Sequence, residues 1–170
     1  AGGNLTITSG TFNLDCADDT LHAGGVIKIS DGKITALSGD DGIHSDTELT
    51  ITGGTIDIQK SYEGLEGVNI NIEGGDISVV ASDDGINVND SNGLLNITGG
   101  TTYVNARGDG LDSNGSITMT GGTVLVDGPT SNGDGALDYD HTATITGGTL
   151  VAAGSSGMVQ AITANDNKST

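Results

Sequence analysis

Acidic residues recur at one fixed position in successive segments of this chain, in a pattern that could bind metal ions. At this position an acid is followed by a small residue and then an aliphatic one, as in Asp41-Gly42-Ile43. The acids of this first column are Asp19, Asp41, Glu63, Asp84, Asp109 and Asp134. A second polar column follows the aliphatic residue and consists of His22, His44, Glu66, Asn87, Asp112 and Asp138. Further carboxylates precede the first column at Asp18, Asp40 and Asp83.

Calcium is the cation that this pattern favours. If the segments stack as neighbouring strands, equivalent carboxylates lie about 4.8 Å apart and repel one another by roughly 1 kcal/mol in water, and by more near a protein surface. Calcium relieves such repulsion because it takes about six to eight oxygen ligands. We expect the glycine after each acid to let backbone carbonyl oxygens join the carboxylates. The alternative is that the acids are turn residues pointing into solvent, since aspartate is common in turns. The predicted calcium ligands are Asp19, Asp40, Asp41, Glu63, Glu66, Asp83, Asp84, Asn87, Asp109, Asp112, Asp134 and Asp138.

Glycine turns at regular intervals divide the chain into the repeats that position these acids. Their second residues are Gly10, Gly32, Gly54, Gly75, Gly100, Gly122 and Gly148, spaced 21 to 26 residues apart. A period of this length indicates structural units that stack on their neighbours as a solenoid. Apolar and polar residues alternate on both sides of each turn, which is typical of half-buried strands.

The repeat predicts an all-β parallel β-helix of about seven coils, each of about 22 residues with three short strands. One column of aliphatic residues is expected to point inward from each strand. For the third strand this column is Leu21, Ile43, Leu65, Ile86, Leu111, Leu137 and Val159. We expect a single domain over residues 1–170, with the longer coils carrying loops at Asp90–Gly93 and Asp127–Gly133.

The composition suits a solenoid and limits the partners. Aromatic residues make up 2% of the chain, too few for a compact core but enough for a thin stack of aliphatic side chains. A net charge of −18 excludes nucleic acids and anionic membrane surfaces as partners, because both require a positive surface. No apolar run is long enough to span a bilayer. If the protein is exported, we expect its signal peptide to have been removed already.

Several motifs give the chain a family resemblance. The segments Leu49-Thr-Ile-Thr-Gly-Gly-Thr55, Tyr62-Glu-Gly-Leu-Glu66 and Asp83-Asp-Gly-Ile86 resemble the secreted carbohydrate-binding domain-containing proteins of clostridia and related bacteria. The resemblance implies a right-handed, pectate-lyase-like parallel β-helix with bound calcium, located extracellularly or at the cell surface. It also implies binding of cellulose and acidic plant polysaccharides without lyase action. The calcium ligands that it implies are drawn from Asp41, Glu63, Glu66, Asp83 and Asp84.

The few cationic and aromatic residues bear on catalysis and sugar binding. A pectate lyase requires a lysine or arginine to take a proton beside the metal, and Lys60 and Arg107 are the candidates. We interpret them instead as lone cations on an acidic surface, and we predict no catalytic residues. We expect Tyr62, Tyr103, Lys60 and Arg107 to contact carbohydrate. Tyr103 is expected on an outward column with Leu125 and Val151.

Two other functional classes remain open from the sequence. The chain enters and leaves the repeat pattern without a recognisable cap, so copies could stack end to end into filaments. Outward Thr-x-Thr pairs, such as Thr50 and Thr52 here, also occur in ice-binding solenoids. In this chain Lys28 and Glu73 interrupt the column of threonines.

Overall fold

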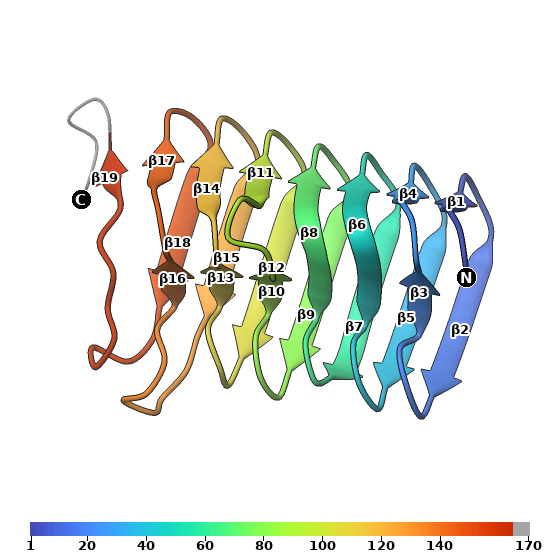
Figure 1. The fold of residues 1–170 in the computed structure, drawn as a ribbon, viewed down its shortest axis with the longest axis horizontal. Helices are drawn as coiled ribbons and strands as arrows, with labels where there is room; N and C mark the ends of the chain where they lie inside the picture. Colours follow the sequence, from blue (N-terminus) through green and yellow to red (C-terminus); the bar gives the residue numbers. More distant parts are fainter. Residues whose placement is uncertain (165–170) are drawn as a thin grey trace.

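The computed structural model describes residues 1–164, and its regular elements are all β-strands stacked along one axis (Figure 1). The strands form two parallel sheets. The seven-strand sheet contains β2 (Thr11–Cys16), β5 (Lys33–Ser38), β7 (Thr55–Ser61), β9 (Asp76–Ala81), β12 (Thr101–Ala106), β15 (Thr123–Asp127) and β18 (Thr149–Ala153). The twelve-strand sheet has a main row of β1 (Leu5–Ile7), β4 (Ile27–Ile29), β6 (Ile43–Ile51), β8 (Leu65–Ile72), β11 (Leu94–Ile97), β14 (Ser116–Met119), β17 (Ala143–Ile145) and β19 (Thr163–Ala164). Its remaining strands are β3 (Leu21–Ala23), β10 (Ile86–Val88), β13 (Leu111–Ser113) and β16 (Leu137–Tyr139).

The pairing register confirms the predicted solenoid. Each strand pairs in parallel with the equivalent strand one coil away, so that Leu49 lies beside Ile70, and Ile70 beside Leu95. The repeat of about 22 residues is therefore the length of one turn of the solenoid, and about seven turns are present.

The three strands of each coil are organised into two sheets. In the middle coils the third strand runs without interruption into the first strand of the next coil, which produces the long strands β6 and β8. The pairing of β6 with β8 shifts between Ser45 and Glu48. A bulge of this kind bends a strand locally.

The glycine turns have the backbone conformation that their residue type permits. The second residue of each of the seven turns has a positive φ, between 78° and 115°. Only glycine adopts such angles without a steric penalty from Cβ. The regular spacing of these glycines therefore reports the point at which each coil passes from the twelve-strand sheet to the seven-strand sheet.

The core is a narrow stack of aliphatic side chains between the two sheets. Isoleucines dominate it, and Ile43, Ile58 and Ile72 are fully buried. Burying one such side chain contributes roughly 1.5–3 kcal/mol, so the column accounts for stability without aromatic residues. The prediction for Val159 is wrong, because that side chain is 70% exposed and lies outside any strand.

The longer coils place their extra residues in loops, as predicted. A turn occupies residues 89–93 between β10 and β11, and residues 128–136 connect β15 to β16 without a strand. Residues 165–170 of the predicted domain lie outside the described residues. Among residues 1–164 no helix has the length and apolar character needed to cross a membrane.

Candidate functional site

The predicted acids lie in the turns that lead from the seven-strand sheet back to the twelve-strand sheet. These turns form the lower edge of the molecule in Figure 1, opposite the glycine turns. We call this edge the acid corner and define it by the two columns that begin at Asp19 and His22. It extends across successive coils because every coil crosses the edge at the same point of its sequence.

The register of the second column is as predicted. His22 pairs with His44 and His44 with Glu66, and the column continues through Asn87 and Asp112 to Asp138. The prediction for Asp134 is wrong in register. Leu111 pairs with Leu137, so Gly135 takes the place one coil beyond Asp109, and its N–H donates to Asp109 Oδ1 at 2.6 Å. The extra residues of this 26-residue coil place Asp134 one residue farther out, where it accepts a hydrogen bond from Ser131.

The first-column acids hold neighbouring coils together. Asp41 N–H donates to Asp19 Oδ1 at 3.0 Å, and Glu63 N–H donates to Asp41 Oδ1 at 3.3 Å. Asp109 N–H donates to Asp84 Oδ1 at 2.7 Å. The side chains of Asp19 and Asp41 are 9% and 8% exposed, so these acids are not solvent-directed turn residues. One oxygen of each carboxylate therefore has a structural role, and the other is available for a ligand.

The glycines after the acids let neighbouring coils pack closely, and the carbonyl ligands expected beside them stay a prediction. A Cβ on Gly85 would lie 2.1 Å from Val104 Cγ1 and 2.6 Å from the carbonyl oxygen of Gly110. These glycines are required for close packing of the coils against the core. The Glu63 and Asp84 carbonyl oxygens each accept an N–H donor from the preceding coil.

Burial and mutual repulsion raise the pKa values of these carboxyl groups. Burial is the largest cause, and neighbouring carboxylates add to it. The pKa is raised to about 7 for Glu63, about 6 for Asp84 and about 7 for Asp112. Burial, followed by Glu66, raises the pKa of Asp41 to about 9, and burial also raises that of Asp109. These carboxyl groups therefore bind protons more readily near neutral pH than free carboxyl groups do.

The middle of the acid corner offers oxygen ligands alone. Carboxylate oxygens of Glu63, Asp83 and Asp84 lie within 4.8 Å of one another. Asn87 Nδ2 donates to Glu63 at 2.8 Å, whereas Asn87 Oδ1 is buried and accepts no hydrogen bond from residues 1–164. A buried carbonyl oxygen without a donor, among carboxylates, has the chemistry of a ligand for a hard cation.

Lysine and arginine do not neutralise this charge. Among residues 1–164, the ion pairs involve His22 or His44, and no lysine or arginine nitrogen lies within 4.0 Å of a carboxylate oxygen. Lys60 is exposed near the end of β7, and Arg107 is exposed just after β12. Tyr62 is 49% exposed, and its hydrogen bond to Asp83 raises the pKa of its hydroxyl to about 12.

The structure adds three residues that the sequence interpretation did not count as ligands. His22, His44 and Asp46 converge at one end of the acid corner with Asp19, and both imidazoles approach carboxylates. The histidines' places in the second column were visible in the sequence. The position of Asp46 was not, because it lies in the bulge of β6.

The outward face of the seven-strand sheet carries the second candidate surface. Tyr103, Leu125 and Val151 form a column across three coils and are 37%, 39% and 55% exposed, as predicted. Toward the N-terminus, Tyr103 pairs with Ser78 of the preceding coil, and Ser78 pairs with Asp57 of the coil before that. Apolar side chains therefore continue directly into polar ones on one flat face.

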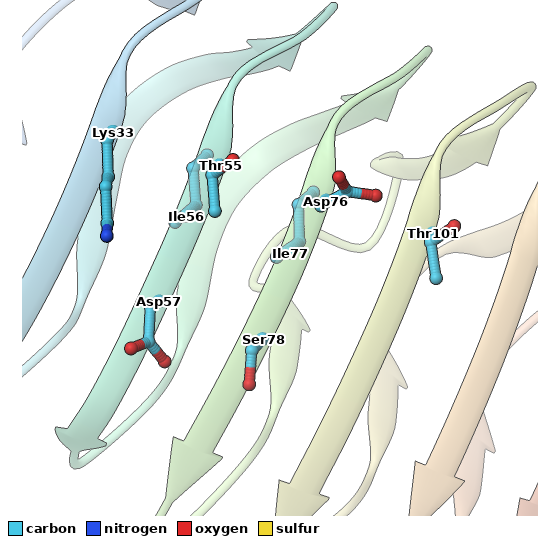
Figure 2. A pocket seen from close by; sticks show the side chains of 8 residues that line it. All are labelled: Lys33, Thr55, Ile56, Asp57, Asp76, Ile77, Ser78 and Thr101. Carbon is cyan, nitrogen blue, oxygen red and sulfur yellow. The ribbon is translucent and has the colours of Figure 1, made fainter. Parts of the chain in front are cut away.

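The polar part of this face contains an open pocket of about 300 Å³. Figure 2 shows its lining on four adjacent strands, β5, β7, β9 and β12. The lining residues are Lys33, Thr55, Ile56, Asp57, Asp76, Ile77, Ser78 and Thr101. Hydroxyl, carboxylate and ammonium groups thus line the pocket, whose Ser78 pairs with Tyr103 and whose Lys33 lies three strands away from it.

A second groove lies where β12 and β15 leave this face. Its volume is about 540 Å³, and Asn105, Arg107, Asp127 and Ser131 are among its lining residues. Tyr103 and Arg107 are therefore connected along β12, whereas Lys60 and Tyr62 lie on and after β7. The four residues predicted to bind carbohydrate are thus divided between two places, with one of each pair on β7 or β12 and the other just after it.

The fold and its carboxylate edge define an acidic parallel β-solenoid with a candidate metal-binding corner. A family model described as "Carbohydrate-binding domain-containing protein" matches residues 1–42 and 40–169. The chain belongs to this family, as the sequence motifs predicted. No curated protein and no solved structure matches the chain.

Proposed function

We propose that this protein is a calcium-binding β-helix that binds polysaccharide without catalysis, outside the cell or at its surface. Family membership is the observation that carries the sugar-binding function. The extended flat face of the seven-strand sheet supports it, because a polymer can lie across several coils there.

Calcium fits the middle of the acid corner. Glu63, Asp83, Asp84 and Asn87 would hold it, with Asp112 in the neighbouring coil. The donors are carboxylate and amide oxygens, which suit calcium, and no lysine or arginine of residues 1–164 competes for them. Bound calcium supplies positive charge that neutralises the column and can attract the carboxylates of acidic sugars.

Polysaccharide binding uses the outward face around Tyr103. The ring of Tyr103 offers an apolar surface for the C–H face of one sugar of the polymer. Ser78 in the adjacent coil, and Asp57 and Lys33 one and two coils farther along, offer hydrogen-bonding groups to hydroxyls of the polymer. Polar groups of this kind fix orientation in carbohydrate sites, and aromatic contact supplies area. Neutral glucans are expected here, independently of calcium. Acidic polymers are expected to depend on calcium, and Lys60, Tyr62 and Arg107 near the corner assist them.

Binding to insoluble cellulose tests the neutral-sugar surface. Replacing Tyr103 with Ala should weaken binding about tenfold, equivalent to about 1.4 kcal/mol, without changing the melting temperature. Tyr62→Ala is the comparison variant for cellulose, because this exposed tyrosine lies near the acid corner and is proposed to contact acidic polymers only. Equal loss in both variants, or no binding by the unmodified protein, would contradict this site.

Experiments with polygalacturonate test both the proposed calcium-dependent binding of acidic polysaccharides and the proposed absence of catalysis. Retardation in gels that contain this polymer should require calcium and disappear with EDTA. No unsaturated product should accumulate in the ultraviolet spectrum, because Lys60 and Arg107 act only as surface charges. A calcium-dependent increase in absorbance would overturn the non-catalytic proposal.

A further inference from the structure

Two histidines stack face to face at the N-terminal end of the acid corner. The rings of His22, on β3, and His44, on β6, have centroids 4.6 Å apart and planes within 4° of parallel. Both Nδ1 atoms face Asp19 Oδ2, at 3.0 Å from His22 and 3.6 Å from His44. Both Nε2 atoms face Asp46 Oδ1, at 2.9 Å and 3.6 Å. In both rings Nδ1 therefore faces Asp19, and Nε2 faces Asp46.

The Nδ1 side has the spacing of a coordination shell. His44 Nδ1 lies 3.4 Å from Asp41 Oδ2 and 3.6 Å from Asp19 Oδ2. Adjacent ligands of a tetrahedral ion lie about 3.3 Å apart when the metal–ligand bonds are about 2.0–2.1 Å. One atom from each of Asp19, His22 and His44 falls within 4.8 Å of the other two. The cluster can therefore contract around one ion without a change of fold.

The buried carboxylate of Asp41 lies on the His44 side of the cluster. Its side chain is 8% exposed, its Oδ1 accepts the Glu63 N–H, and its Oδ2 lies 3.4 Å from His44 Nδ1. Glu66 Oε2 approaches the same nitrogen at 3.2 Å, and the side chains of Asp41 and Glu66 share a hydrogen bond. Asp41, His44 and Glu66 therefore form a second group of possible ligands, which shares His44 with the first group.

Asp46 completes the arrangement from the other side of the rings. It lies in the β6 bulge, where Ser45 and Glu48 pair with Gly67 and Asn69, so that Asp46 and Thr47 face only one residue of β8. Histidines that bind metal through one nitrogen usually donate the other N–H to a carboxylate. An N–H on Nε2 pointing to Asp46 leaves the lone pair of Nδ1 free for a metal.

We propose that this end of the acid corner is a separate site for a borderline divalent metal such as Zn²⁺. Its ligands are His22 Nδ1, His44 Nδ1 and Asp19 Oδ2, which form one group of potential metal ligands, and Asp46 orients both rings. The nitrogen ligands set the site apart from the middle of the corner, because imidazole suits zinc and similar ions whereas calcium takes oxygen. The proposal is independent of sugar binding.

Zinc titration in the presence of excess calcium tests the site on the complete chain. Isothermal titration calorimetry should give one equivalent of bound Zn²⁺ that calcium does not displace. His44→Gln should weaken zinc binding by more than about 100-fold, and Asp46→Asn, which alters only orientation, by about 10–100-fold. His141→Gln is the matched control, because His141 is exposed and lies outside the cluster. The calcium-induced increase in melting temperature should persist in His44→Gln.

A second measurement keeps the test decisive if His44→Gln fails to fold. In nitrogen-15 spectra of the unmodified protein, Zn²⁺ should shift the ring signals of His22 and His44 and leave those of His141 unchanged. Displacement of zinc by calcium, equal zinc affinity in His44→Gln and His141→Gln, or shifts confined to His141 would each overturn the proposal.

Discussion

The raised carboxyl pKa values predict that the metal-free protein loses stability as the pH rises. A pKa raised in the folded state means that folding binds protons that the unfolded chain has released. The resulting stabilisation is fully present below the ordinary pKa values of 3.8 and 4.5, and it is lost as the pH passes through about 6 to 9. In EDTA, stability should therefore fall between pH 6 and pH 8.

The size of the loss follows from proton linkage. Each proton held by the folded state alone lowers the free energy of unfolding by about 1.4 kcal/mol per pH unit. Glu63, Asp84, Asp112 and Asp41 repel one another and are partly screened by water, so we count them as about one net proton. Across two pH units this amounts to about 3 kcal/mol. For a chain of this size the melting temperature should fall by about 6–12 °C.

Thermal melts followed by circular dichroism at pH 6 and pH 8, in EDTA and in calcium, measure this effect. Calcium should remove most of the pH dependence because it replaces the lost protons. The double variant Glu63→Gln, Asp112→Asn should flatten the curve in EDTA, whereas Asp57→Asn on the opposite sheet should not. A melting temperature in EDTA that is constant or increases from pH 6 to pH 8 would refute the reasoning.

Three further predictions follow from the same structure. Gly85→Ala should destabilise the fold by about 1–3 kcal/mol in chemical denaturation, since its Cβ would meet Val104, whereas Gly133→Ala, with no neighbour within 4 Å, should not. Calcium at a hundred times its dissociation constant should stabilise the protein by about 2.7 kcal/mol, and magnesium should stabilise it much less. Glu63→Gln should reduce the stabilisation by calcium, whereas Glu73→Gln, at an exposed position, should leave it intact. End-to-end association of copies, predicted from the sequence, should appear as a concentration-dependent increase in mass by light scattering, and a constant monomer mass with and without calcium would contradict it.

Much of the fold could be read from the sequence because it depends on local pattern. The glycine turns determine where each coil passes from the twelve-strand sheet to the seven-strand sheet. The alternation of residues around Ile51 and Ile56 determines which side chains face inward. Once neighbouring coils have nearly equal length, parallel pairing brings equivalent residues into columns. The second column from His22 to Asp138 follows from this rule alone.

The sequence failed where coil length or local bending changed. Asp134 leaves the first column because its coil carries extra residues, and Gly135 pairs in its place. Asp46 reaches the histidines because a bulge, invisible in the alternation of residue types, redirects it. Val159 has the apolar character of the core column but is exposed.

The sequence by itself therefore determined the solenoid, its columns and the concentration of acids at one corner, since these properties depend on residue type and spacing. Only the tertiary structure determined how deeply each acid is buried, which hydrogen bonds it accepts and which side chains surround it. It buried Asp41, left Asn87 Oδ1 without a donor and divided the corner into an oxygen-only part and a histidine-containing part. The physical reason is that hydrogen bonding and ion binding change over distances of less than 1 Å, and such distances between coils depend on bulges, loop lengths and core packing.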